Sequence, residues 1–332
     1  MSTIIPELPR FRLAALPTPL VRLTRLERQF PGAQIWIKRD DLTGLEFSGN
    51  KIRKLEFVMA DAQRGGCDTI VTEGTPQSNH CRATAAACAR LGMRCVLLLR
   101  PGSSGLRQGN HLLDHLFGAD LRFYERLKFD EQRNAIVRSV IDELRATGRA
   151  PRWTPMGASE ALGALSYLAA AEELCAQLAI QGVSECDVVV AVSSGGTHAG
   201  LALGEQASTQ ARLRVFAVPV SDDVAHHRRV VSELCSEAVA ALSLPLKFDA
   251  ARLRFIDGYV GAGYAVPYAA AIDAIRLLAR EEAIILDPVY TAKAFCGLLA
   301  GLRDGALGRE RPVVFIHTGG IFSNFAWPEL FP

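Results

Sequence analysis

The stretch VVVAVSSGGTHAG, residues 188–200, decides the expected fold. Its first five residues are an apolar, β-branched run that is typical of a strand buried on both faces. The serines and glycines that follow, from Ser193 and Ser194 through Gly195 and Gly196 to Thr197, form a turn, and a helix of small residues is expected to begin near Leu201. A strand, a glycine-rich turn and a helix in this order can hold a phosphate on backbone N–H groups, although the same residues also serve as a plain tight turn.

Strand-like and helix-like segments alternate on both sides of this stretch. Apolar β-branched runs predict strands at residues 34–38, 69–72, 95–99, 120–123, 188–192, 214–220 and 313–317. The clearest amphipathic stretches predict helices at residues 50–63, 79–91 and 159–180. The alternation predicts an α/β protein whose open, twisted parallel sheets carry helices on both faces. A chain of 332 residues exceeds one usual core, so two lobes are expected, with the crossing near Pro151.

Composition excludes several classes of function. The formal net charge is only +2, which provides no broad basic field for nucleic acid. No apolar run approaches the roughly 18 residues that a membrane span needs. The eight cysteines lack a C-x-x-C pair and predict reduced thiols, with no metal site. The first 20 residues lack the unbroken apolar core of a secretion signal, so we expect a cytoplasmic protein.

The segment SGNKIRKLEF, residues 48–57, contains a candidate catalytic amine. Gly49 and Asn50 form a turn before a helix, which places Lys51 near a helix N-terminus. The positive helix end, together with Arg53 and Lys54, is expected to lower the pKa of Lys51 and to favour a neutral amine that can form an imine. Taken alone, a surface lysine at a basic helix start explains the same residues.

Three further turns follow predicted strands. The turn GTPQSNH, residues 74–80, can hold a carboxylate at a helix N-terminus, or it is a simple N-cap by Ser78 or Asn79. The segments DPVYT, residues 287–291, and IHTGG, residues 316–320, carry polar side chains that could face a cleft at strand ends. Singly, Tyr290 could equally be a core aromatic and Thr318 a turn residue.

In order, the segments SGNKIRKLEF, GTPQSNH, SSGGTHAG, DGYVGAGYAVP, DPVYTAKAF and FIHTGG resemble the D-cysteine desulfhydrase and 1-aminocyclopropane-1-carboxylate deaminase family. The resemblance spans the chain from Thr18 to Gly320. It implies pyridoxal 5'-phosphate as cofactor, a two-lobed fold type II architecture like that of the tryptophan synthase β subunit, and a homodimer. It also implies a small lobe of residues 48–160, carrying Lys51, and a large cofactor-binding lobe of residues 1–47 plus 161–332.

The resemblance also implies roles for individual residues. Lys51 matches the lysine that holds the cofactor as a Schiff base and moves the α-proton. Ser78, Asn79 and His80 match the turn that receives the substrate carboxylate, and Asn79 also matches the partner of the cofactor's 3-hydroxyl. Lys54 and the turn of residues 193–197 match the phosphate site. Tyr264 and Tyr290 match the two tyrosines that face the substrate.

Two positions separate the branches of this family. Where the deaminases have glutamate and leucine, this chain has Thr291 and Thr318, which is the desulfhydrase pattern and implies a neutral ring nitrogen. The resemblance therefore favours α,β-elimination from D-cysteine, giving pyruvate, hydrogen sulfide and ammonia. An L-cysteate sulfo-lyase, a deaminase of the cyclopropane amino acid and a silent ligand-binding protein of the same fold stay open, because Ser48 and residues 321–324 depart from many members.

A nicotinamide-dependent dehydrogenase is the alternative from another enzyme class. The turn of residues 193–197 could in principle serve a dinucleotide, but it lacks the G-x-G-x-x-G spacing. The sequence also offers no clear acidic partner for a ribose. The residues therefore favour the pyridoxal-phosphate enzyme over the dehydrogenase.

Overall fold

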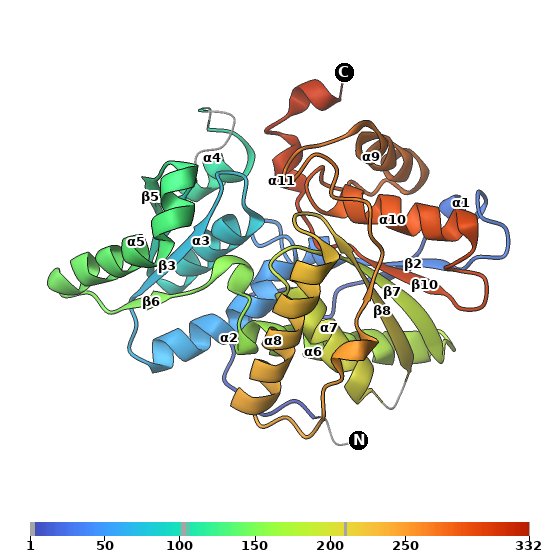
Figure 1. The fold of residues 1–332 in the computed structure, drawn as a ribbon, viewed down its shortest axis with the longest axis horizontal. Helices are drawn as coiled ribbons and strands as arrows, with labels where there is room; N and C mark the ends of the chain where they lie inside the picture. Colours follow the sequence, from blue (N-terminus) through green and yellow to red (C-terminus); the bar gives the residue numbers. More distant parts are fainter. Residues whose placement is uncertain (1–3, 101–104, 106, 209–210, 332) are drawn as a thin grey trace.

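The protein folds into two α/β lobes that lie side by side (Figure 1). The computed structural model describes residues 4–100, 105, 107–208 and 211–331. One lobe is built on a six-stranded sheet and the other on a four-stranded sheet. Each sheet carries helices on both faces, which confirms the predicted fold class.

The larger sheet has the strand order β1-β2-β10-β7-β8-β9, in which only β1 is antiparallel to its neighbour. Its strands are β1 (Leu20–Arg22), β2 (Ile35–Lys38), β7 (Glu185–Val192), β8 (Arg212–Pro219), β9 (Arg254–Phe255) and β10 (Val313–Ile316). The helices around it are α1 (Thr24–Glu27), α6 (Ala161–Ile180), α7 (Gly196–Ala207), α8 (Val224–Ala241), α9 (Ala269–Glu282), α10 (Thr291–Asp304) and α11 (Ile321–Asn324).

The central strand β7 is buried on both faces, as its apolar run predicts. Val188 and Val190 pack into the core formed with α6, α7 and α8. Val189 points to the opposite face and packs with α9 and α10. Successive side chains of a strand alternate between faces, so one apolar run serves two helical layers.

The smaller sheet is entirely parallel and has the order β5-β4-β3-β6. Its strands are β3 (Thr69–Gly74), β4 (Arg94–Leu99), β5 (Asp120–Phe123) and β6 (Pro151–Trp153). The helices of this lobe are α2 (Asn50–Arg64), α3 (Asn79–Leu91), α4 (Gly109–Leu116) and α5 (Arg126–Ala146). Helices α2 and α3 share the core on one face of the sheet, and α5 packs on the other face.

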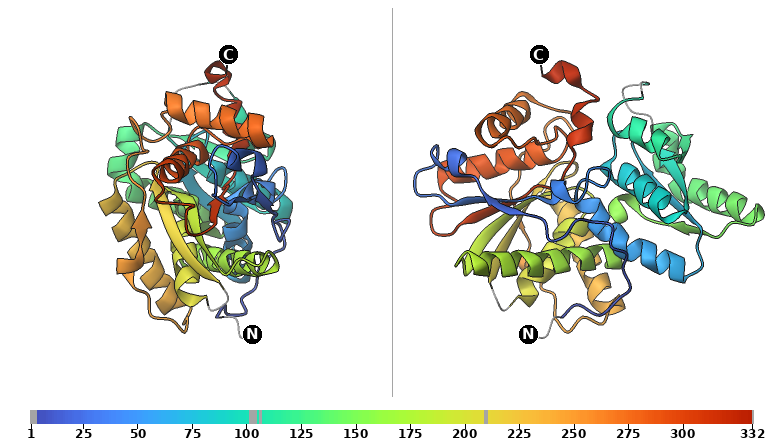
Figure 2. Two further views of the ribbon diagram at one scale, coloured as in Figure 1. Left: turned by 90° about the vertical axis from the view of Figure 1, so that its right-hand side faces the viewer. Right: turned by 180° about the vertical axis from the view of Figure 1, so that it is seen from behind.

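Helix α2 begins between the two lobes, as Figure 1 and the right-hand view of Figure 2 show. Ile52 and Leu55 belong to the core of the smaller lobe, while Phe57 packs with α6 in the core of the larger one. The helix that begins at the candidate amine therefore contacts both lobes. Where the chain is divided between the two lobes stays a prediction.

Pro151–Trp153 forms β6, which pairs with β3 at the edge of the smaller sheet, so the crossing between lobes that is expected near Pro151 stays a prediction. Proline is tolerated at the first residue of an edge strand, where its missing N–H costs nothing. Helix α7 begins at Gly196 and not near Leu201, so the glycine turn runs directly into the helix.

Other expectations hold. All seven predicted strands and the three predicted helices are present, with ends shifted by a few residues. All eight cysteines are free thiols. Within the described ranges, no helix combines the length and apolar character that a bilayer crossing requires.

Candidate active site

A cavity lies where the C-terminal end of β7 meets the N-termini of α2 and α3. Eight of the predicted site residues line it: Lys51, Asn79, Ser193, Ser194, Gly195, Thr197, Tyr290 and Thr318. Asn50, Ala191, Val192 and His198 complete the lining. Open α/β sheets bind ligands at the carboxyl ends of their strands, and this cavity occupies that position.

The turn before α2 is locked to the end of β10. The Asn50 backbone N–H donates to the Thr318 carbonyl at 3.1 Å, and the Asn50 side chain donates to the Thr197 hydroxyl at 2.9 Å. Gly49 has a φ of +113°, and a β-carbon there would lie 2.6 Å from the Thr318 carbonyl oxygen. Only glycine permits this approach, which brings Lys51 beside both the 193–197 turn and Thr318.

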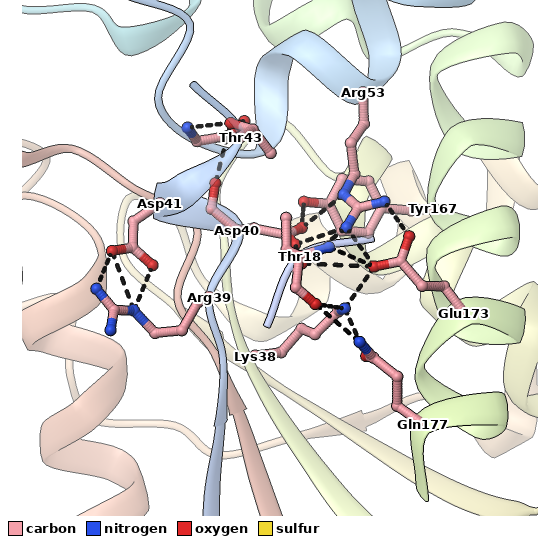
Figure 3. Close-up of polar contacts among 11 residues, drawn as sticks. Thr18, Lys38, Arg39, Asp40, Asp41, Thr43, Arg53, Tyr167, Glu173 and Gln177 are labelled. Atoms are coloured by element: carbon pink, nitrogen blue, oxygen red, sulfur yellow. Dashed lines mark hydrogen bonds and ion pairs between the residues drawn. The ribbon is translucent and has the colours of Figure 1, made fainter. Parts of the chain in front are cut away.

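A buried network of charges holds the other face of α2 (Figure 3). The Arg53 guanidinium donates to both carboxylate oxygens of Asp40, at 2.8 and 3.0 Å, and to both of Glu173, each at 2.9 Å. Lys38 also donates to Glu173, and the Tyr167 hydroxyl donates to Asp40 at 2.5 Å. The network ties α2 to α6 and to the end of β2, so Lys51 sits on a fixed helix.

Burial lowers the pKa of Lys51 to about 8. The predicted direction is correct, but the expected cause is wrong, because loss of solvent and not the neighbouring cations produces the shift. The charge of Arg53 is balanced by its two carboxylate partners. Burial also lowers the pKa of Lys54, with the charge of Lys51 as a second cause. A neutral amine at position 51 is therefore accessible near neutral pH.

The 193–197 turn is shaped by close contacts that only glycine allows. Gly195 has a φ of +88°, and a β-carbon on Gly196 would lie 2.9 Å from the Lys54 Nζ. The Ser159 hydroxyl accepts from the Gly196 N–H at 3.1 Å and donates to the Ser194 hydroxyl at 2.9 Å. Lys54 thus lies against the turn, as predicted for a phosphate site, and its Nζ donates to the Gly157 carbonyl.

Sequence reasoning missed four residues at or behind the cavity. Asn50 and His198 line it, Ser159 supports the 193–197 turn, and Asp287 caps the turn that carries Tyr290. Asn50 stood inside a quoted motif and could have been found there. Ser159 had no local signal, because its partners follow 35 and 37 residues later.

The two predicted tyrosines contact each other, since the hydroxyl groups of Tyr264 and Tyr290 are hydrogen bonded. Tyr290 lines the cavity, and burial raises the pKa of both phenols. Thr291 does not reach the cavity. Its hydroxyl donates to the Asp287 carboxylate and accepts from the Asp287 N–H, both at 2.7 Å. Of the two predicted threonines, only Thr318 is placed to contact a ligand.

The turn at residues 74–80 combines capping with one cavity residue. Ser78 is the N-cap of α3 and accepts from the Cys81 N–H at 3.2 Å. Asn79 lines the cavity, and its side-chain oxygen accepts from Asn110 at 2.9 Å. The His80 ring does not face the cavity as a ligand, because its Nε2 is bonded to the Thr72 hydroxyl at 2.8 Å. The backbone N–H of position 80, in the first turn of α3, has no partner within the helix and is available to a carboxylate.

Comparison with known proteins gives this geometry a family. Residues 11–319 match the sequence profile described as pyridoxal-phosphate dependent enzyme. The chain belongs to this family. Within it, the chain is a member of the D-cysteine desulfhydrase and 1-aminocyclopropane-1-carboxylate (ACC) deaminase group. Pyridoxal 5'-phosphate is its cofactor, and the dehydrogenase alternative is excluded.

Individual proteins and structures of this group are similar to the chain over nearly its whole length. The D-cysteine desulfhydrases of Salmonella paratyphi A and Salmonella choleraesuis are each 40% identical to the chain, with 96% of both partners covered. A crystal structure of an ACC deaminase homologue superposes with a TM-score of 0.88 at 35% identity, covering 98% of this chain and 96% of that one. O-ureido-L-serine synthase has a TM-score of 0.67 at 18% identity and covers 94% and 92%, a likeness of fold alone.

The residues around the cavity fit pyridoxal phosphate. The turn of residues 193–197 leads into the N-terminus of the 12-residue helix α7, and Lys54 adds positive charge beside it, which suits a phosphate dianion. Lys51 provides an amine of lowered pKa for the aldehyde. Asn79 brings a side-chain amide to the same cavity, and Thr318 brings a hydroxyl. No acidic side chain lines the cavity within the described part of the chain.

Proposed function

We propose that this pyridoxal-phosphate enzyme eliminates the β-substituent of a small amino acid, with D-cysteine as the substrate. The reaction consumes D-cysteine and water and yields pyruvate, hydrogen sulfide and ammonia. One observation carries the proposal. Lys51, with its lowered pKa, shares a cavity with the 193–197 turn and with Thr318. The position at which the deaminases have glutamate is Thr291 in this chain, and Thr291 lies outside that cavity.

Each residue has a defined task in this reaction. When bound, pyridoxal phosphate would supply an aldehyde that reacts with amines and a ring that withdraws electrons from the α-carbon of the substrate. The 193–197 turn and Lys54 would hold the phosphate, and Lys51 Nζ would hold the aldehyde carbon. The N–H groups at positions 79 and 80 and the Ser78 hydroxyl would orient the substrate carboxylate. Lys51 Nζ would also be the base that takes the α-proton of the substrate.

The tyrosine pair is the proposed proton source at the opposite end of the substrate. Because burial raises the pKa of Tyr290, its phenol keeps its proton at neutral pH and can donate it to a departing sulfur. Tyr264 shares a hydrogen bond with that phenol and orients it. A protonated thiol is a better leaving group than a thiolate, so this pair favours elimination.

Thr318 supports elimination over ring opening. A hydroxyl can donate to a neutral ring nitrogen, but it supplies no negative charge to keep that nitrogen protonated. The electron withdrawal is then weaker, which suits prompt loss of a good leaving group more than cleavage of a cyclopropane bond. L-Cysteate, whose sulfite is also a good leaving group, is the second candidate substrate.

A product screen tests the proposal. The purified holoenzyme is given D-cysteine, L-cysteine, L-cysteate and the cyclopropane amino acid in separate reactions, and sulfide, sulfite, pyruvate and 2-oxobutyrate are measured. We expect sulfide and pyruvate from D-cysteine with the highest kcat/KM. Sulfite from L-cysteate or 2-oxobutyrate from the cyclopropane amino acid at higher kcat/KM would replace D-cysteine as the substrate. No product from any of them would favour the silent ligand-binding alternative.

The assembly and location that accompany this function are also proposals. We infer a homodimer that works in the cytoplasm on a small amino acid, as the family resemblance implies. Sedimentation of the holoenzyme at micromolar concentration should give a single species of twice the chain mass. A monomer that retains full activity would remove the dimer from the account.

A further inference from the structure

The segment that carries Tyr264 has little structure of its own. It runs through residues 256–268 between β9 and α9, outside any helix or strand. Its backbone takes positive φ values at Gly258, Gly261, Gly263 and Ala265. Such a segment needs tertiary contacts to hold one conformation.

Lys293 of α10 supplies the main polar contact to this segment. Its Nζ donates to the Val260 carbonyl at 2.7 Å and to the Gly263 carbonyl at 2.8 Å. The ammonium also lies 5.7 Å from the centre of the Tyr268 ring. The residue is fully buried, with an exposed fraction of 0%. In the described part of the protein, no carboxylate lies within ion-pair distance of it.

A buried ammonium without a carboxylate partner is costly. Desolvation of such a charge costs several kcal/mol, and an apolar side chain of similar length would fill the same space without that cost. Burial accordingly lowers the pKa of Lys293, while the more distant Asp287 acts in the opposite direction. The ammonium is instead stabilised by hydrogen bonds to two carbonyl groups of one loop.

The position of Lys293 connects that hold to the active site. Tyr290 is the N-cap of α10, and Lys293 follows three residues later, on the same side of the helix. Gly263, whose carbonyl Lys293 binds, directly precedes Tyr264. The helix therefore fixes one tyrosine through its backbone and the other through the lysine, and the two phenols meet in a hydrogen bond.

We propose that Lys293 is a positioning residue that sets the Tyr264 hydroxyl against Tyr290. The inference rests on the proposed function, because it assigns Lys293 a role through the proton-donating pair. It predicts that the loop loses its single conformation when the ammonium is removed, while the cofactor site at Lys51 keeps its own contacts.

A double-mutant cycle tests the link. Lys293→Met should lower kcat for D-cysteine between about ten- and a hundredfold, because a displaced Tyr264 hydroxyl no longer orients the proton-donating phenol of Tyr290. Combined with Tyr264→Phe, the same change should cost less than about twofold, since the hydroxyl it positions is already gone. The cofactor absorbance should be unchanged throughout. Losses that multiply in the double variant, or a Lys293→Met enzyme as active as the wild type, would overturn the proposal.

Hydrogen exchange separates failure of this link from failure of the proposed function. Amides of residues 257–266 should exchange faster in the Lys293→Met holoenzyme, whichever substrate the enzyme uses. Tyr268→Phe is the matched control, because it removes the Tyr268 hydroxyl, with its hydrogen bonds to the Tyr259 carbonyl at 3.2 Å and to Cys296, and keeps both carbonyl contacts of Lys293. We expect its kcat and its exchange around Tyr264 to match the wild type. Unaltered exchange in Lys293→Met would overturn the proposal even if the chemistry is as proposed.

Lys293→Gln is the second variant, for the case in which Lys293→Met does not fold. Glutamine keeps an N–H donor without the charge, and the variant is combined with Tyr264→Phe in the same double-mutant cycle. Its loss of kcat should again vanish in the Tyr264→Phe background. A full loss that persists there would contradict a role through Tyr264. If Tyr264→Phe alone is as active as the wild type, Tyr264 does not orient the Tyr290 phenol, and the proposal that Lys293 positions Tyr264 for the reaction is overturned.

Discussion

Thr291 and Thr318 follow equivalent-looking turns but have different surroundings. Thr291 is fully buried, and its hydroxyl exchanges two hydrogen bonds with Asp287. Thr318 lines the cavity, and we propose that its hydroxyl contacts the ring nitrogen of the cofactor. The sequence pattern does not distinguish the two threonines. In the structure, Thr291 stabilises the turn at Asp287, whereas Thr318 lines the cavity.

The two threonines should therefore give opposite results on substitution. Thr318→Val should shift the visible absorbance of the bound cofactor and lower kcat, with little change in the midpoint of urea unfolding. Thr291→Val should cost about 1–3 kcal/mol of stability, because it leaves a buried carboxylate short of a donor. Its absorbance should stay close to that of the wild type. The reverse assignment of the two effects would show that Thr291 contacts the ring.

The lowered pKa of Lys51 predicts the pH dependence of cofactor uptake. Only the neutral amine attacks an aldehyde, so uptake by the apoenzyme should slow about tenfold for each pH unit below the pKa and level off above it. With a pKa of about 8, the rate should reach its plateau near pH 9. An ordinary lysine would still gain rate up to about pH 10.4. Stopped-flow absorbance between pH 6.5 and 10.5 distinguishes the two profiles.

At the level of elements, α2 depends on a charge network that no local pattern shows. Arg53 was taken from the sequence as a neighbour that perturbs Lys51, but its side chain leaves the site and meets Asp40 and Glu173. These partners are 13 and 120 residues away. Contacts at such separations depend on how the lobes pack and have no signature in spacing.

Two arginines drawn in Figure 3 provide a matched pair for this network. Arg53→Met should destabilise the protein by about 3–5 kcal/mol, because it leaves the buried carboxylate of Asp40 without its ion-pair partner and leaves Glu173 with Lys38 alone. Arg39→Met removes a partly exposed ion pair with Asp41, two residues further along the chain. This substitution should cost about 0–1 kcal/mol of stability. Urea unfolding of the holoenzyme measures both. Equal losses would mean that the network adds little to the hold on α2.

The early start of α7 has a packing cause that the sequence conceals. Gly196 and Gly200 precede the start that the sequence predicts near Leu201, and Gly204 lies inside the helix, although glycine disfavours helix interiors. A β-carbon on Gly200 would lie 2.2 Å from the Ala164 carbonyl oxygen, and one on Gly204 would lie 2.2 Å from the Ala171 β-carbon. Close packing on α6 therefore requires glycine and overrides propensity.

For the whole molecule, the sequence predicted the features that depend on a periodic pattern or on residues close together in the chain. The alternation of apolar runs and amphipathic stretches predicted both sheets, and six ordered motifs predicted the family. Short elements such as β1, β6 and β9, of two or three residues each, escaped because they hold no complete period. Ser159 and Lys293 escaped because their roles exist only after distant turns come together.

The central claim is that Lys51, and no other lysine, carries the cofactor. Borohydride reduction of the holoenzyme followed by peptide mass mapping tests it directly, because reduction turns the imine into a stable label on one side chain. We predict a phosphopyridoxyl group on Lys51, in the peptide that contains residues 48–52. A label on Lys54, which lies one turn further along α2, or on any lysine outside the cavity would contradict the account.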